Sequence, residues 1–192
     1  LITVGSPHKG SWVLSADKGI YNFPAIGPTV EKGISDFVLQ AVNQGKTMKL
    51  DKNSSAVKQI YPGSEFLEGY NGINKNTPQD VEYATFYGDI HATVRRQLFG
   101  SVIEKKISIG DGLITPESAS GIAGVSPKKF PYSEETVLDL KLKRLTDSYA
   151  LTVDLPNLQS LSAFHTYLLD RSDLRKDLAC RVLERKDADL CK

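Results

Sequence analysis

This chain has few residues of several types, little net charge and no long apolar run, and the last two absences each exclude a class of protein. The 192 residues include two cysteines, one tryptophan, one methionine and three histidines. Lys and Arg total 24 against 23 Asp and Glu, which leaves a formal net charge of +1. Because a nearly neutral chain has no electrostatic reason to bind nucleic acid, we expect no nucleic-acid partner. No run of about 18 apolar residues occurs, so we expect no transmembrane segment.

The two cysteines, Cys180 and Cys191, lie eleven positions apart near the end of the sequence. No histidine lies near them, so they predict no metal site, and we expect neither a metal nor a cofactor. The two thiols either stay free or close one small loop, so cysteine usage leaves the cellular compartment open.

The residues that are present describe an ordinary globular chain. A content of 40% hydrophobic and 24% charged residues is enough to bury a core, and it predicts one domain over residues 1–192. Short basic runs at residues 105–106, 128–129 and 141–144 are interleaved with acidic residues. Each run by itself predicts a solvated face.

The first residues of the sequence form an apolar, β-branched run, Leu-Ile-Thr-Val at residues 1–4. The run has no polar alternation, which predicts a strand covered on both faces in a mostly parallel sheet. Because this strand opens the sequence without a cap or turn before it, we expect the chain to be the second half of a longer protein.

The rest of the sequence predicts a mixture of helices and strands. Apolar residues at helical spacing predict helices at residues 30–43, 54–61, 64–70 and 166–184. The last of these helices has a predicted buried stripe of Leu169, Leu174, Leu178 and Val182. A segment rich in aromatic and β-branched residues predicts a central strand at residues 81–87, followed by a connection that is partly helical around residues 93–99. Two stretches of alternating polarity, at residues 138–143 and 149–155, predict a hairpin near the sheet edge.

Two residues could take part in hydrolytic chemistry. His165 lies at a junction between a loop and a helix, and Asp111 lies between Gly110 and Gly112 in a sharp turn. A hydrolytic triad needs a buried carboxylate that orients an imidazole. The local sequence pattern alone favours structural roles for both residues: His165 would flank a helix, and Asp111 would form an Asp-Gly turn.

Four motifs in order resemble those of lipase- and esterase-like α/β-hydrolases. Gly-Ser-Pro-His-Lys-Gly at residues 5–10 resembles the turn after the sixth strand, and residues 55–71 resemble a cap stretch. Residues 81–88 look like the seventh strand, and residues 110–119 resemble the loop that carries the catalytic acid. His165 then matches the catalytic histidine that follows the eighth strand.

This resemblance implies an α/β fold, namely the C-terminal portion of an α/β-hydrolase. Its expected features are a mostly parallel sheet flanked by helices and a helical cap insertion at residues 11–78. The implied activity is serine-dependent hydrolysis of a carboxylic ester, with His165 as the general base and Asp111 orienting it. Apolar cap residues would line an acyl pocket, or equally belong to the core: Phe37, Val38, Ile60 and Phe66.

The sequence departs from the family at the nucleophile, because no G-x-S-x-G elbow occurs in it. Ser6 lies one strand too late in the pattern, and Pro7 after it has no backbone N–H for an oxyanion hole. We therefore expect the nucleophile on an N-terminal half of the same hydrolase, cleaved or separate. This half, or a second copy of the chain, would pair with the edge of residues 1–4. The implied substrate is an acyl ester or lipid.

Two other classes of function stay open. One is a non-catalytic interaction module that keeps an α/β-hydrolase-like fold. The other is an acyltransferase or thioesterase on the same scaffold, since one fold can support several chemistries.

Overall fold

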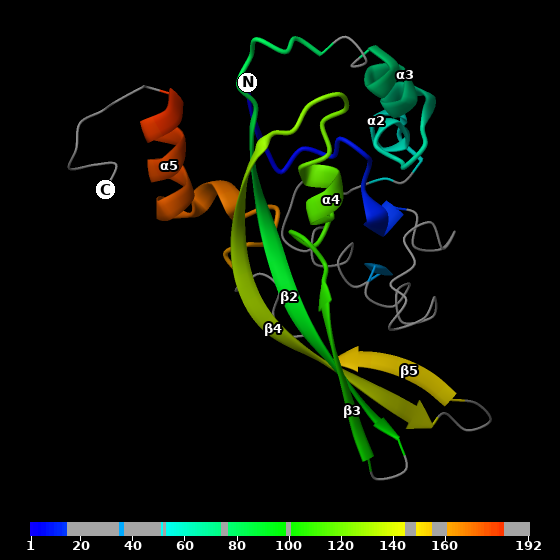
Figure 1. The fold of residues 1–192 in the computed structure, drawn as a ribbon. Helices are drawn as coiled ribbons and strands as arrows, with labels where there is room; N and C mark the ends of the chain where they lie inside the picture. The colour runs from blue at the N-terminus through cyan, green and yellow to red at the C-terminus, as the bar shows by residue number, and fades with distance from the viewer. Residues whose placement is uncertain are drawn as a thin grey trace.

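The computed structural model describes residues 1–14, 35–36, 51, 53–73, 77–98, 101–144, 149–154 and 161–182. Within these residues the strands are β1 (Ile2–Val4), β2 (Ala84–Leu98), β3 (Ser101–Ser108), β4 (Lys128–Arg144) and β5 (Tyr149–Asp154) (Figure 1). The α-helices are α2 (Ser55–Gln59), α3 (Glu65–Ile73), α4 (Pro116–Ala119) and α5 (Ser172–Val182). Two 3₁₀ turns, η1 (Trp12–Leu14) and η5 (Leu168–Asp170), complete the described elements.

The described strands form one mixed sheet in the order β1-β2-β4-β5, with β3 also paired to β2. β1 and β4 run parallel to β2, whereas β3 is antiparallel to β2 and β5 is antiparallel to β4. The expected mostly parallel sheet flanked by helices is therefore wrong. Only residues 99–100 and 145–148 separate the antiparallel partners, so hairpins take the place of the long crossovers that parallel strands need.

The central strand β2 is longer than its sequence pattern predicts. It continues through Gly88 and Asp89 to Leu98, so the helical connection expected around residues 93–99 is wrong where the structure describes it. Ala92 and Val94 are buried, which is the period-two pattern of a strand. Backbone pairing on both edges, to β3 and β4, stabilises this extension.

The predicted hairpin near the sheet edge is confirmed as β4 and β5, although β4 begins at Lys128. The predicted opening strand is confirmed as β1, and its three residues are partly buried. In the described part of the chain, β1 pairs with β2 alone.

The short helices predicted after residue 53 are confirmed as α2 and α3. Ser54 caps α2, because its side chain accepts a hydrogen bond from the backbone N–H of Val57. The helix predicted at residues 30–43 lies outside the described residues, except that residues 35–36 are helical. Most of the proposed cap at residues 11–78 lies outside them as well.

The last helix, α5, starts six residues later than predicted, after η5. Leu174 is fully buried, but Leu169 is 58% exposed and does not belong to the buried stripe. Cys180 in α5 is disulfide-bonded. The other cysteine in the sequence, Cys191, lies outside the described residues.

The first half of β2 carries core contacts on both faces of the sheet. On one face Ala84 and Phe86 pack against Leu168 and Leu174, which places α5 there. On the other face Tyr87 belongs to a second cluster with residues from α4 and the loop before it. α4 and α5 consequently lie on opposite sides of the sheet (Figure 1). The second halves of β2 and β4 extend away from these helices with β3 and β5.

Candidate functional site

Two strand ends face each other along one edge of β2. β1 pairs with residues 84–86 and β3 with residues 91–98 on that edge, and the two strands run in opposite directions. After β1, the N–H of Gly5 donates to the carbonyl of Phe86. After β3, the carbonyl of Gly110 accepts from the N–H of Ile90. The loops that follow both strands therefore meet beside the middle of β2.

Hydrogen bonds join these two loops into one unit. The hydroxyl of Ser118, which is fully buried, donates to the carbonyl of Gly10 at 2.7 Å and accepts from the N–H of Lys9 at 3.0 Å. The hydroxyl of Ser11 donates to the carbonyl of Leu113 at 2.6 Å. Because each polar group has a partner inside the protein, the two loops hold each other in one arrangement.

Asp111 lies in the second loop, and its carboxylate is fully buried. Oδ1 accepts hydrogen bonds from the backbone N–H groups of Leu113 at 3.0 Å and Ile114 at 2.8 Å. Oδ2 lies 2.6 Å from Nδ1 of His165. These contacts satisfy a buried carboxylate, which would otherwise be strongly destabilising.

His165 is held at two points by the same residue. Its backbone N–H donates to the carbonyl of Asp111 at 2.9 Å, and its ring contacts the Asp111 carboxylate. A carboxylate accepts hydrogen bonds, so this contact favours a proton on Nδ1 and a basic Nε2. The His165 side chain is 33% exposed, so part of the ring is accessible. The structure thus brings together the two predicted site residues, which are 54 positions apart.

Glycines permit close packing around this pair. A Cβ atom on Gly5 would lie 3.3 Å from Cε1 of His165, and the positive φ of +53° also favours glycine there. A Cβ atom on Gly88 would lie 3.0 Å from the Cβ of Asp111 and 2.0 Å from the carbonyl oxygen of Ala163. The loop that carries His165 can therefore lie directly against β2.

The acyl pocket predicted from the cap stays a prediction. Phe37 and Val38 lie outside the described residues, Ile60 is partly buried and Phe66 is 54% exposed. A pocket of about 530 Å³ lies beside α4, and neither Ile60 nor Phe66 lines it.

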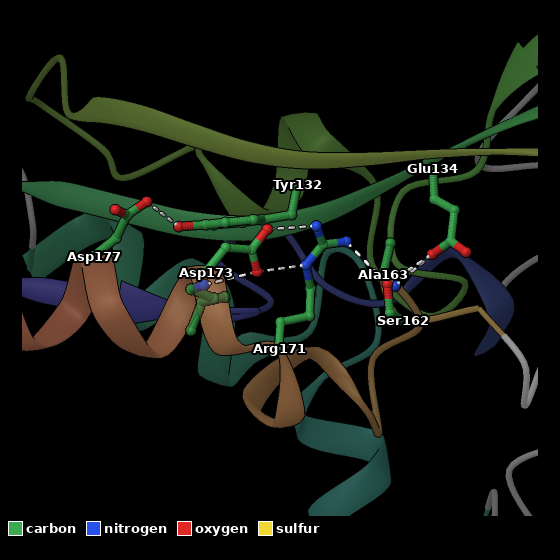
Figure 2. A network of polar contacts seen from close by, with 8 residues as sticks. Tyr132, Glu134, Ser162, Ala163, Arg171, Asp173 and Asp177 are labelled. Carbon is green, nitrogen blue, oxygen red and sulfur yellow. Dashed lines mark hydrogen bonds and ion pairs between the residues drawn. The ribbon is translucent and has the colours of Figure 1, made fainter. Parts of the chain in front are cut away.

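A polar network anchors the loop before His165, and the sequence gives no local signal of it (Figure 2). Oε2 of Glu134 on β4 accepts from the N–H of Ala163 at 2.9 Å and from the hydroxyl of Ser162 at 3.1 Å. Nη1 of Arg171 donates to the Ser162 hydroxyl at 3.0 Å. Arg171 also donates two hydrogen bonds to the Asp173 carboxylate, which lowers the pKa of that carboxyl.

The same network connects α5 to the sheet. The hydroxyl of Tyr132 on β4 donates to Asp177 at 2.5 Å, and burial together with this hydrogen bond raises the pKa of Tyr132. The guanidinium of Arg171 lies 5.2 Å from the centre of the Tyr132 ring, within the range of a cation–π interaction. Figure 2 shows these contacts along one side of β4. Strand β4 thus anchors both α5 and the loop that positions His165.

We expect Glu134→Ala to loosen the His165 loop, because it leaves the Ala163 N–H and Ser162 hydroxyl without their acceptor. The free energy of unfolding should fall by about 1–3 kcal/mol, measured by urea denaturation. Amide exchange at Ala163 and His165 should accelerate. Glu134→Gln is the matched control, since its amide oxygen can still accept from Ala163. Unchanged exchange in the alanine variant would show that Glu134 does not anchor the loop.

His8 lies in the first loop, where it is 6% exposed and its Nε2 is 3.3 Å from the Thr3 hydroxyl. Burial lowers the pKa of His8 from its ordinary value of 6.5, so the unfolded chain binds a proton at higher pH than the folded chain. The neutral, buried form of His8 therefore contributes fully to the free energy of unfolding above pH 6.5, and this contribution is lost as pH falls below 6.5. We expect His8→Gln to weaken the loss of stability on acidification, measured by urea denaturation across this range. An identical pH profile would contradict this expectation.

The third histidine, His91, lies on β2 with Nε2 3.4 Å from Oδ2 of Asp89. Its side chain is 43% exposed, against 14% for Asp89. This pair lacks the buried carboxylate of the Asp111 and His165 pair. It therefore offers a comparison for variants of His165.

Comparisons with family models, with curated proteins and with solved structures find no match to this chain. The resemblance carried by the four motifs accordingly stays a prediction. Among the described residues, no helix is both long and apolar enough to cross a membrane.

Proposed function

We propose that this chain supplies the carboxylate, Asp111, and the general base, His165, of a serine-type triad that hydrolyses carboxylic esters. The observation that carries the proposal is the buried Asp111 carboxylate, 2.6 Å from Nδ1 of the partly exposed His165. A triad needs this arrangement because the carboxylate orients the imidazole and stabilises the imidazolium that forms during the reaction.

In the proposed reaction, Nε2 of His165 removes the proton from a serine hydroxyl as its oxygen attacks the ester carbonyl. The tetrahedral intermediate collapses, the C–O bond to the alcohol breaks, and His165 returns the proton to the leaving alkoxide. Water then attacks the acyl-enzyme with His165 again as the base, which releases the carboxylic acid and regenerates the serine. Asp111 holds the ring and balances its positive charge in both halves of the reaction.

The nucleophile is proposed to come from a segment outside this sequence, because the sequence contains no G-x-S-x-G elbow. Strand β1 supports this proposal, because it is the end strand of the order β1-β2-β4-β5 in the described residues. An edge of unpaired backbone groups favours addition of a strand from another segment or from a second copy.

Cys180 is disulfide-bonded, a state that oxidising compartments favour.

The test uses the natural full-length protein, or this chain reassembled with the segment that carries the nucleophile. We expect labelling by a fluorophosphonate probe and turnover of p-nitrophenyl esters. His165→Gln should lower kcat/KM by about 10⁴-fold, whereas the matched variant His91→Gln should retain activity. Retained activity in His165→Gln would remove His165 from the proposed triad.

The same assay separates the other two functions. Faster turnover of thioesters, or transfer of the acyl group to an added alcohol, would indicate a thioesterase or an acyltransferase. Absence of both labelling and turnover would favour a non-catalytic interaction module.

A further inference from the structure

The distal arm consists of the two hairpin ends that lie beyond the helices: residues 93–98 and 101–106 of β2 and β3, and residues 139–144 and 149–154 of β4 and β5. Arg96 of β2 pairs with Leu140 of β4, so the two hairpins are joined side by side. Figure 1 shows this arm projecting away from α4 and α5. Its surface is therefore separate from the Asp111 and His165 site.

The distal arm concentrates positive charge in a chain that is otherwise slightly acidic. It contains seven basic and three acidic residues, an excess of four, whereas the whole chain has a net charge of +1. The basic residues are Arg95, Arg96, Lys105, Lys106, Lys141, Lys143 and Arg144. The sheet brings together short basic runs that are far apart in the sequence. Such local charge attracts an anionic surface even when the net charge of the chain is small.

The end of the distal arm also exposes aliphatic side chains. Val102 is 58% exposed and Ile103 is 54% exposed, and both lie on β3 close to its turn with β2. Successive strand residues point to opposite faces, so both faces of this hairpin end carry an apolar group. Lys105 and Lys106 are also exposed, two and three residues beyond Ile103, and the intervening Glu104 is paired with Arg95 at 2.8 Å. Aliphatic groups near the turn with lysines further from it match the depth profile of a lipid interface.

We propose that the end of the distal arm binds the surface of an anionic lipid bilayer. Val102 and Ile103 enter the boundary between headgroups and acyl chains, and the exposed Lys105 and Lys106 contact the anionic headgroups. Exposed aliphatic residues favour a bilayer over a nucleic acid, because a duplex presents a charged phosphate backbone and single strands are bound by stacking on aromatic rings. The loop that carries Asp111 is hydrogen-bonded to Ile90, and Ile90 lies eight residues before Leu98, so about 27 Å of β2 separates this loop from the end of the distal arm. Binding of a bilayer at that end leaves the proposed hydrolytic site accessible, and the proposed binding does not depend on hydrolysis.

The test measures co-sedimentation of the full chain with phosphatidylcholine vesicles, with and without phosphatidylserine. Binding should require phosphatidylserine and weaken with added salt. Lys105→Gln with Lys106→Gln should weaken it about 25-fold, since each basic residue near an anionic surface contributes about fivefold. Val102→Ser with Ile103→Ser should weaken it by at least about tenfold, because both aliphatic groups lose their contact with lipid.

Matched controls lie away from the distal arm. Lys58→Gln on α2 removes an exposed basic residue, and Val81→Ser removes an apolar residue that is 39% exposed before β2 begins. Both controls should bind like the parent, and circular dichroism should show that all variants are folded. Equal binding to vesicles without phosphatidylserine, or equal binding by the arm variants, would overturn the proposal. Tighter binding to a DNA duplex than to vesicles would also overturn it.

Discussion

Asp111→Asn is expected to lower kcat/KM for ester hydrolysis by about 10⁴-fold while the protein stays folded. The amide oxygen can still accept from the N–H groups of Leu113 and Ile114, so the loop keeps both hydrogen bonds. The amide nitrogen, however, would donate to Nδ1 of His165 and place the ring proton on Nε2. Nε2 could then no longer accept the serine proton. The measurement compares kcat/KM with the urea midpoint of unfolding in the full-length protein.

Two results separate this effect from general damage to the loop. Asp111→Ala leaves the two N–H groups without an acceptor, so it should lose activity and about 1–3 kcal/mol or more of stability together. Asp111→Asn should lose activity with a much smaller change in stability. An Asn variant with parental kcat/KM would show that Asp111 does not orient the base.

Gly88→Ala is expected to destabilise the protein by about 3 kcal/mol or more. The added Cβ would lie 2.0 Å from the carbonyl oxygen of Ala163 and 3.0 Å from the Cβ of Asp111. Both neighbours belong to the loops of the proposed site, and the closer one is backbone that cannot move without shifting His165. We therefore expect activity to fall as well. Urea denaturation measures the first effect and ester turnover the second.

Gly69→Ala is the matched control, because a Cβ at Gly69 would meet nothing within 4 Å. Gly69 lies inside α3, where alanine should stabilise the helix by about 0.5–1 kcal/mol. If Gly88→Ala unfolded at the same urea concentration as the parent, the close approach of the His165 loop to β2 would be wrong.

Local sequence patterns predicted those elements that neighbouring residues are sufficient to form. The opening strand, α2, α3 and the β4–β5 hairpin follow from apolar periodicity, capping and turn residues. The length of β2 did not follow, because Gly88 and Asp89 resemble the end of a strand. In the fold, Gly88 continues the strand and allows the Ala163 carbonyl to approach.

The candidate site was predictable only in part. The resemblance of the motifs to a hydrolase family named Asp111 and His165, and the structure places them in contact. No motif indicated Glu134 or Arg171, because they hold the His165 loop through Ala163 and Ser162, which lie 29 and 9 positions away from them in the sequence. Contacts between residues so far apart depend on how the strands pair, and period and composition do not encode that pairing.

Composition and periodicity were sufficient to establish a globular chain with a core and to place several of its helices and strands. The direction of strand pairing needed the folded chain, because one strand can pair both ways: the alternating strand β4 runs parallel to β2 and antiparallel to β5. The contact of buried Asp111 with His165 and the position of separate basic runs on the distal arm both depend on the tertiary structure. Both bring together segments that are distant in sequence, and only backbone hydrogen bonding between strands and core packing place those segments side by side.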